Sequence, residues 1–81
     1  MDITNGSLVY SRAGRDKGTL FVVIKTEGDW AYLADGDLRR VEKPKKKRLK
    51  HINKTNKSAE IDFENISDSM LRKALAKAEA E

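Results

Sequence analysis

The amino-acid sequence predicts a small all-β barrel of about five short strands, followed by a C-terminal α-helix. Two observations indicate this fold class: short apolar runs alternate with glycine-containing turns as far as residue 52, and apolar residues take helical spacing only from residue 66. The chain has 81 residues, a length that fits one domain. We therefore divide it into a barrel over residues 1–57 and a linker with an amphipathic helix over residues 58–81.

The first two strands are predicted over residues 6–11 and 19–25, with a loop over residues 13–17 between them. Leu8 and Tyr10 fall on one face of the first strand. The second strand carries the run Leu-Phe-Val-Val-Ile, which is β-branched, aromatic and nearly uninterrupted. Such a run predicts burial on both faces of the strand, as in a small closed barrel.

The centre of the chain is predicted to form a hairpin. A turn over residues 26–29 leads to a third strand over residues 30–34. Asp35 and Gly36 then make the dipeptide typical of a two-residue hairpin, because both positions tolerate a positive φ. A fourth strand over residues 38–42 follows from this turn.

Three features mark the end of the predicted barrel. Pro44 has no backbone N–H, so a turn or a sheet edge is expected there. Leu49 and Ile52 anchor a short fifth strand over residues 48–52. Residues 54–57 are polar and are expected to be mobile.

Apolar residues take helical spacing from Ile66 onward, which predicts the C-terminal helix. Ser67 is the expected N-cap, and Asp68 lies in the first turn, where the helix dipole favours a negative charge. Ile66 is expected to pack on Leu71. One face of this helix carries an apolar stripe of Met70, Leu71, Ala74, Leu75 and Ala78. The stripe predicts a helix that covers the barrel, and docking of a protein partner is the alternative.

Basic residues are concentrated in one part of the chain, although the net charge of the whole chain is only +4. Residues 39–57 hold ten basic and one acidic side chain, net +9, whereas residues 1–38 carry −2 and residues 58–81 carry −3. A local block of this kind attracts polyanions. A solvated charged face is the alternative.

Nothing in the sequence points to a catalytic or metal site. Cysteine is absent, which excludes disulfides and cysteine-ligated metals, and His51 is the only histidine. We therefore expect a protein that is not an enzyme and needs no cofactor. No secretory signal is visible, and no apolar run approaches the roughly 20 residues that span a bilayer. A cytoplasmic monomer without membrane contact is expected.

Two stretches of the chain resemble a known family. SLVYSRAGRDKGTLFVVI, residues 7–24, resembles the KOW motif, a strand–loop–strand unit whose signature glycine is matched by Gly18. With YLADGDLRRVEKPKKKRLKHI, residues 32–52, it is similar to the large-subunit ribosomal protein fourteen family of archaea and eukaryotes and to its small bacterial relatives. The resemblance covers residues 6–52 and implies an SH3-like barrel that binds RNA, usually ribosomal RNA.

The resemblance also implies which residues contact RNA. The loop supplies Arg12, Gly14, Arg15, Lys17 and Gly18, and the segment after the predicted hairpin supplies Arg39, Arg40, Lys47, Arg48, Lys50 and His51. The basic run adds Lys43, Lys45 and Lys46. We expect these residues to dock on the sugar-phosphate backbone of ribosomal RNA, in a ribosome-associated or ribosome-assembly role. A protein-interaction module and a transcription-associated KOW module are the alternatives.

Two pairs of residues leave two interpretations open. Gly14 and Gly18 are turn glycines, points where the backbone approaches RNA, or both. Trp30 and Tyr32 alternate on one face of the third predicted strand, where they either fill the core or stack on unpaired bases. The core is the more frequent place for such residues.

Overall fold

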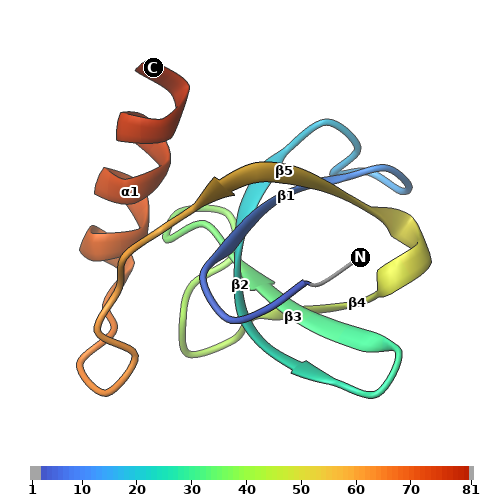
Figure 1. The fold of residues 1–81 in the computed structure, drawn as a ribbon, viewed down its shortest axis with the longest axis horizontal. Coiled ribbons are helices and arrows are strands. Elements are labelled where there is room, and N and C mark those ends of the chain that lie inside the picture. The colour runs from blue at the N-terminus through green and yellow to red at the C-terminus, as the bar shows by residue number, and fades with distance from the viewer. Residues whose placement is uncertain (1–2, 81) are drawn as a thin grey trace.

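The computed structural model describes residues 3–80 and shows a strongly bent antiparallel sheet with a helix against its outer side (Figure 1). The elements are β1 (Ser7–Ser11), β2 (Leu20–Glu27), β3 (Trp30–Ala34), β4 (Lys45–Arg48), the 3-10 helix η1 (Leu49–His51), β5 (Ile52–Ser58) and α1 (Asp68–Ala80). The five strands lie in the order β4-β3-β2-β1-β5. The fold is therefore mainly β with a C-terminal helix, as predicted, but the sheet is not closed, because β4 and β5 form its two edges.

The first three strands confirm the prediction. β1 and β3 lie where they were expected, and β2 continues beyond the predicted end at residue 25 as far as Glu27. The turn after β2 is short because Glu27 pairs directly with Trp30. Gly28 in this turn has a φ of +60°, a conformation that glycine adopts without steric cost.

The apolar run of β2 is buried on both faces, as predicted, but the two faces have different partners. Phe21 and Val23 belong to a cluster on the concave side of the sheet, with residues of β1, β3 and β5. Leu20 and Val22 belong to a second cluster on the convex side, which α1 covers (Figure 1). The curvature of the sheet encloses one face and the helix covers the other, so burial on both faces does not require a closed barrel.

The helix α1 covers the sheet through the predicted apolar stripe. The N–H of Met70 donates to Ser67 Oγ at 3.3 Å, which confirms Ser67 as the N-cap. Ile66 packs against the convex cluster, to which the helix contributes Leu71, Leu75 and Ala78. Within residues 3–80, no helix is long and apolar enough to cross a membrane.

The predicted hairpin at residues 35–36 is wrong, and residues 38–42 form a loop instead of a strand. Asp35 is buried, and its Oδ1 accepts hydrogen bonds from the backbone N–H groups of Asp37 and Arg39, at 3.0 and 2.8 Å. The carboxylate therefore organises a longer turn in place of a two-residue one.

This longer loop, residues 35–44, is held by the start of α1. Arg72 Nη1 donates to the carbonyl O of Gly36 at 2.6 Å, and the N–H of Val41 donates to Asp68 Oδ1 at 2.7 Å. The partners in these two hydrogen bonds are 36 and 27 residues apart in the chain. A local sequence pattern cannot reveal such partners.

The last two strands also differ from the prediction. β4 is the basic run itself and pairs with β3, while Pro44 directly precedes this edge strand. The predicted strand over residues 48–52 is occupied mainly by η1, and residues 54–57, expected to be mobile, belong to β5. Lysine-rich segments have low strand propensity, so pairing with a neighbouring strand decides their structure.

Candidate nucleic-acid interface

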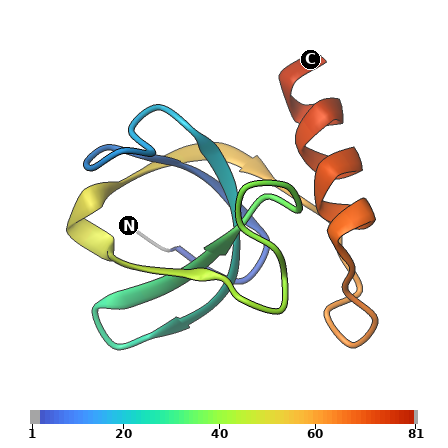
Figure 2. The same ribbon diagram turned by 180° about the vertical axis from the view of Figure 1, so that it is seen from behind.

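The predicted RNA-contacting residues lie in four segments of the chain. They are the β1–β2 loop over residues 12–19, the β3–β4 loop over residues 35–44, β4 and η1. In Figure 2 the loop after β1 and η1 lie at the end of the sheet remote from α1, and the loop after β3 lies beside α1. The N–H of Arg12 donates to the carbonyl O of His51 at 2.9 Å, which joins the β1–β2 loop to η1. The structure therefore brings together residues that are far apart in the chain.

Lys47 ties β4 to the β1–β2 loop. Successive residues of a strand point to opposite faces, and Lys47, opposite Ala31, is only 8% exposed. Its Nζ donates to Ser11 Oγ at 2.7 Å, and to the carbonyl O of Ala13 and Asp16 Oδ1 at 2.8 Å each. All three donors of the ammonium group are used within the protein, so Lys47 positions the loop and has no donor left for a phosphate.

Asp16 is the counter-ion of Lys47. Its Oδ1 also accepts from Ser11 Oγ at 2.7 Å, and its buried Oδ2 lies 3.4 Å from Lys45 Nζ, an ion pair without a well-aligned hydrogen bond. Burial alone would raise the pKa of Asp16, but hydrogen bonds from Lys47 and Ser11, the charge of Lys47 and the proximity of Lys45 lower this pKa from 3.8 to about 2. The carboxylate is therefore ionised at neutral pH.

Gly14 and Gly18 allow the β1–β2 loop to turn back on itself. Their φ angles are +84° and +88°, in the region that favours glycine. The N–H of Gly18 donates to the carbonyl O of Ser11 at 2.8 Å, which closes the loop where β2 begins. Apart from Gly18 and its two neighbours in the chain, no atom of the described residues lies within 4 Å of the position that a Cβ of Gly18 would take. The positive φ is sufficient to explain both residues as turn glycines.

Most of the predicted cations are exposed. Lys45 is half-buried, Lys47 is buried, and both pair with Asp16. In the part of the chain from residue 3 to residue 80, no other ion pair is present. The exposed members of the predicted site with a basic side chain are Arg12, Arg15, Lys17, Arg39, Arg40, Lys43, Lys46, Arg48, Lys50 and His51.

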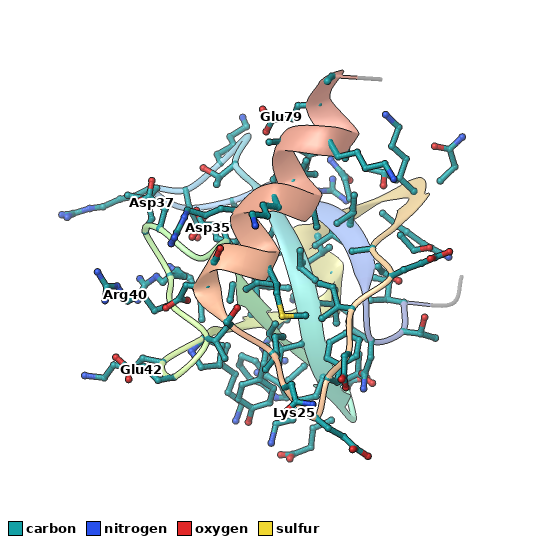
Figure 3. All side chains as sticks on the ribbon, turned by 90° about the vertical axis from the view of Figure 1, so that its left-hand side faces the viewer. Lys25, Asp35, Asp37, Arg40, Glu42 and Glu79 are labelled. Atoms are coloured by element: carbon teal, nitrogen blue, oxygen red, sulfur yellow. The ribbon has the colours of Figure 1, made fainter. Side chains whose placement is uncertain are left out.

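The β3–β4 loop contributes less to the positive field than its basic residues suggest. Residues 35–44 have no net charge, because three cations share the loop with Asp35, Asp37 and Glu42. Figure 3 shows Arg40 and Glu42 projecting from the same side of the molecule. By contrast, residues 12–19 carry +2 and residues 45–54 carry +6. The positive field is therefore centred on the β1–β2 loop, β4 and η1.

A second exposed feature lies on the convex side of β3. Trp30 and Tyr32 are half-buried and belong to neither core cluster, so the core interpretation of these residues is wrong. Lys46 Nζ lies 4.8 Å from the ring centroid of Trp30 and 5.9 Å from that of Tyr32. Arg48 Cζ is 4.7 Å from the Trp30 centroid, and Lys25 Nζ is 4.6 Å from the Tyr32 centroid. We call these five residues the aromatic face.

Lys25 belongs to the aromatic face but not to the predicted site. It pairs with Tyr32 across β2 and β3, while Lys46 pairs with Tyr32 from the other side. The alternation of side chains along β3 predicts this face only when β4 is known to be the neighbouring strand. Residues 38–42 were predicted to be that neighbour instead. In Figure 3, Lys25 lies at the end of the sheet remote from Glu79 and is not covered by α1.

The described residues show no candidate metal centre. Among residues 3–80, no three His, Cys, Asp or Glu side chains are grouped as a metal ion would require.

No protein-family model matches the chain, and no curated protein matches it. The similarity to the KOW-containing ribosomal family therefore stays a prediction.

Proposed function

We propose that this protein binds structured RNA, with ribosomal RNA as the expected target, in ribosome assembly or translation. The observation that carries the proposal is the group of exposed, unpaired cations on the β1–β2 loop, β4 and η1. Unpaired cations on one surface favour binding of the sugar-phosphate backbone, where lysine and arginine position a protein without reading sequence.

The β1–β2 loop is already ordered in the free protein. Lys47 Nζ donates to the carbonyl O of Ala13 in the loop, and Asp16, also in the loop, accepts from Lys47 Nζ and from Ser11 Oγ at the end of β1. A loop that is already ordered loses less conformational entropy on binding, which raises affinity. Arg12, Arg15 and Lys17 project from this fixed frame.

We also assign the sheet to the SH3-like barrels that the KOW resemblance implies. Two features support the assignment: β1 pairs with both β2 and β5, and the one-turn helix η1 connects the two edge strands. Fold alone does not determine function, because barrels of this size also bind proteins. The charge distribution is what favours RNA over a protein partner here.

The test compares two double variants that remove the same charge. In Arg15→Gln/Lys17→Gln the exposed cations of the β1–β2 loop are lost, whereas Lys73→Gln/Lys77→Gln removes two exposed cations of α1. We expect the loop variant to bind a folded RNA hairpin about tenfold more weakly and the helix variant to bind it as the wild type does. Fluorescence anisotropy at matched salt measures both affinities. Equal affinities of the two variants would place the site elsewhere.

Two further measurements separate the target classes. Duplex DNA at the same salt tests the transcription-associated alternative, since binding of DNA as strong as that of RNA would favour it. Sedimentation with ribosomal particles, with and without ribonuclease, tests the ribosomal target. We expect salt-sensitive and ribonuclease-sensitive migration with the large subunit or its precursors. Migration at the top of the gradient under all conditions would remove the ribosome as the main partner.

A further inference from the structure

We propose that the aromatic face is a stacking site for unpaired bases, so that the protein holds a single-stranded RNA segment beside the structured RNA it docks on. The proposal rests on the proposed function and names a second ligand class for the same surface. The RNA-binding sheets of other proteins use exposed aromatic side chains in this way, and every base has a face on which to stack.

The strand period places the two rings side by side. Ala31 and Leu33 point into the concave cluster, so Trp30 and Tyr32 both point to the convex side. Alternate residues of a strand are roughly 6.6 Å apart, which offers two neighbouring rings to consecutive bases. Neither ring belongs to a core cluster, so packing of the core does not explain why β3 has two large aromatic residues at these positions.

The cations of the aromatic face suit a nucleotide better than a peptide or an apolar partner. Lys25, Lys46 and Arg48 approach the rings to within 4.6 to 4.8 Å of a centroid. In the free protein they make cation–π contacts, which are worth little at exposed sites. When a base stacks on a ring, we expect the ammonium or guanidinium group that it displaces to stay beside the ring and to pair with a phosphate of the bound strand.

The aromatic face is continuous with the positive surface. Arg48 ends β4 and is followed directly by η1, which carries the exposed Lys50 and His51. The N–H of Leu49 donates to the carbonyl O of Asp29 at 2.8 Å, so η1 is joined to the turn that precedes Trp30. An RNA strand that leaves the phosphate-binding surface at η1 therefore reaches the rings without crossing α1. Glu27, opposite Trp30, and Asp29, in the turn before Trp30, are acidic residues at the border of this face.

The experiment uses the intrinsic fluorescence of Trp30, the only tryptophan of the chain. A short oligouridylate and an RNA duplex of equal length are titrated at the same salt concentration, and affinity is measured in parallel by anisotropy. We expect the single strand to quench Trp30 fluorescence, because a stacked base contacts the indole, and the duplex to bind without quenching it.

Three variants test the second ring. Tyr32→Leu is expected to weaken oligouridylate binding about tenfold, within the range measured for one stacked base, and to leave duplex affinity unchanged. Tyr32→Phe keeps the ring and should bind as the wild type does. Tyr10→Leu, which removes an aromatic side chain that is 41% exposed on β1, is the matched control and should have no effect. Thermal unfolding of each variant confirms that it is folded.

The outcomes separate this inference from the proposed function. Duplex binding without quenching by the single strand, and with equal oligouridylate affinities for wild type and Tyr32→Leu, would overturn the stacking site and leave the proposed function standing. Binding of neither RNA would overturn both. Loss of affinity in Tyr32→Phe as well as in Tyr32→Leu would assign the effect to the hydroxyl group and so contradict stacking.

Discussion

Lys45, Lys46 and Lys47 are adjacent in the chain but have three different environments. Lys46 is exposed and lies over the rings of the aromatic face, Lys45 is half-buried at 3.4 Å from Asp16, and Lys47 is buried. The strand period separates Lys46 from its neighbours, and the β1–β2 loop separates Lys47 from solvent. A single basic run therefore holds residues suited to RNA binding and a residue required for the fold.

We expect Lys47→Met to destabilise the protein by about 2 to 3 kcal/mol, because it leaves the largely buried Asp16 carboxylate without its main partner. Lys46→Met is the matched control and should change the free energy of unfolding by about 0.5 kcal/mol or less. Urea denaturation at neutral pH measures both. A similar small effect of the two substitutions would show that Lys47 is not a structural residue. The same reasoning means that reversal of Lys45, Lys46 and Lys47 together would disturb folding as well as binding.

The low pKa of Asp16 predicts a loss of stability in acid. Its folded-state pKa of about 2 lies below the value of 3.8 expected for the unfolded chain, so its contribution is complete above about pH 4 and disappears as the pH falls towards 2. The loss should be about 1 to 2 kcal/mol after allowance for solvent screening. Urea midpoints between these pH values, for wild type and Asp16→Asn, measure it. We expect the difference between the two proteins to shrink as the pH falls, and a constant difference would contradict the assignment.

Two glycines with similar φ angles should respond differently to alanine. A Cβ on Gly36, whose φ is +81°, would meet the backbone of Asp68 and lie 3.1 Å from Arg72 Cγ, whereas a Cβ on Gly18 would enter open space. Gly18→Ala should cost about 1 kcal/mol from backbone strain alone, and Gly36→Ala about 3 kcal/mol, because the start of α1 must also move. Thermal unfolding of the pair measures the difference. Equal losses of stability in the two variants would show that the β3–β4 loop can move away from α1 without an energetic cost.

At the level of elements, α1 is part of the core. It supplies buried residues to the convex cluster, holds the β3–β4 loop through Arg72 and Asp68, and receives a hydrogen bond of 2.8 Å from Lys57 Nζ at the carbonyl O of Ala78. The helix therefore stabilises the sheet by covering its convex face.

Leu71→Ala is expected to destabilise the protein by about 2 to 4 kcal/mol, since Leu71 is fully buried on the face of α1 that packs against the sheet. Met70→Ala, at a half-buried neighbouring position, should cost about 1 kcal/mol. Differential scanning calorimetry measures both. RNA affinity of the folded Leu71→Ala variant should match the wild type, because α1 lies outside the positive surface, and a large loss of affinity would implicate the helix in binding.

At the level of the whole molecule, we expect the charge of one surface to determine RNA affinity more than the net charge of the chain does. The chain carries only +4 overall, but its acidic residues lie mainly outside the β1–β2 loop, β4 and η1. If about five cations of this surface neutralise phosphates, the logarithm of RNA affinity should fall with the logarithm of salt concentration at a slope of roughly −3.5 to −4.5. Anisotropy titrations over a range of salt measure the slope. A slope near zero with affinity retained would exclude electrostatic docking.

Much of the fold follows from local patterns in the chain. The strands up to residue 34 were predicted correctly because apolar alternation and the β2 run are local signals, and the helix because Ser67 and the apolar stripe are also local. The β3–β4 loop, β4 and β5 were not, because Gly36, Lys47 and Thr55 are fixed by partners far away in the chain, which a local pattern does not contain. Thr55 Oγ1, for example, donates to the carbonyl O of Leu8 at 2.7 Å.

By itself the sequence determined the mainly β character of the fold, the first three strands, the capped helix and the position of the basic segment, since each depends on residues close together in the chain. Only the tertiary structure decided which basic residues face solvent. It buried Lys47 against Asp16 and placed Trp30 and Tyr32 outside the core beside Lys25. The physical reason is that exposure and pairing depend on strand register and on loops that pack from distant parts of the chain.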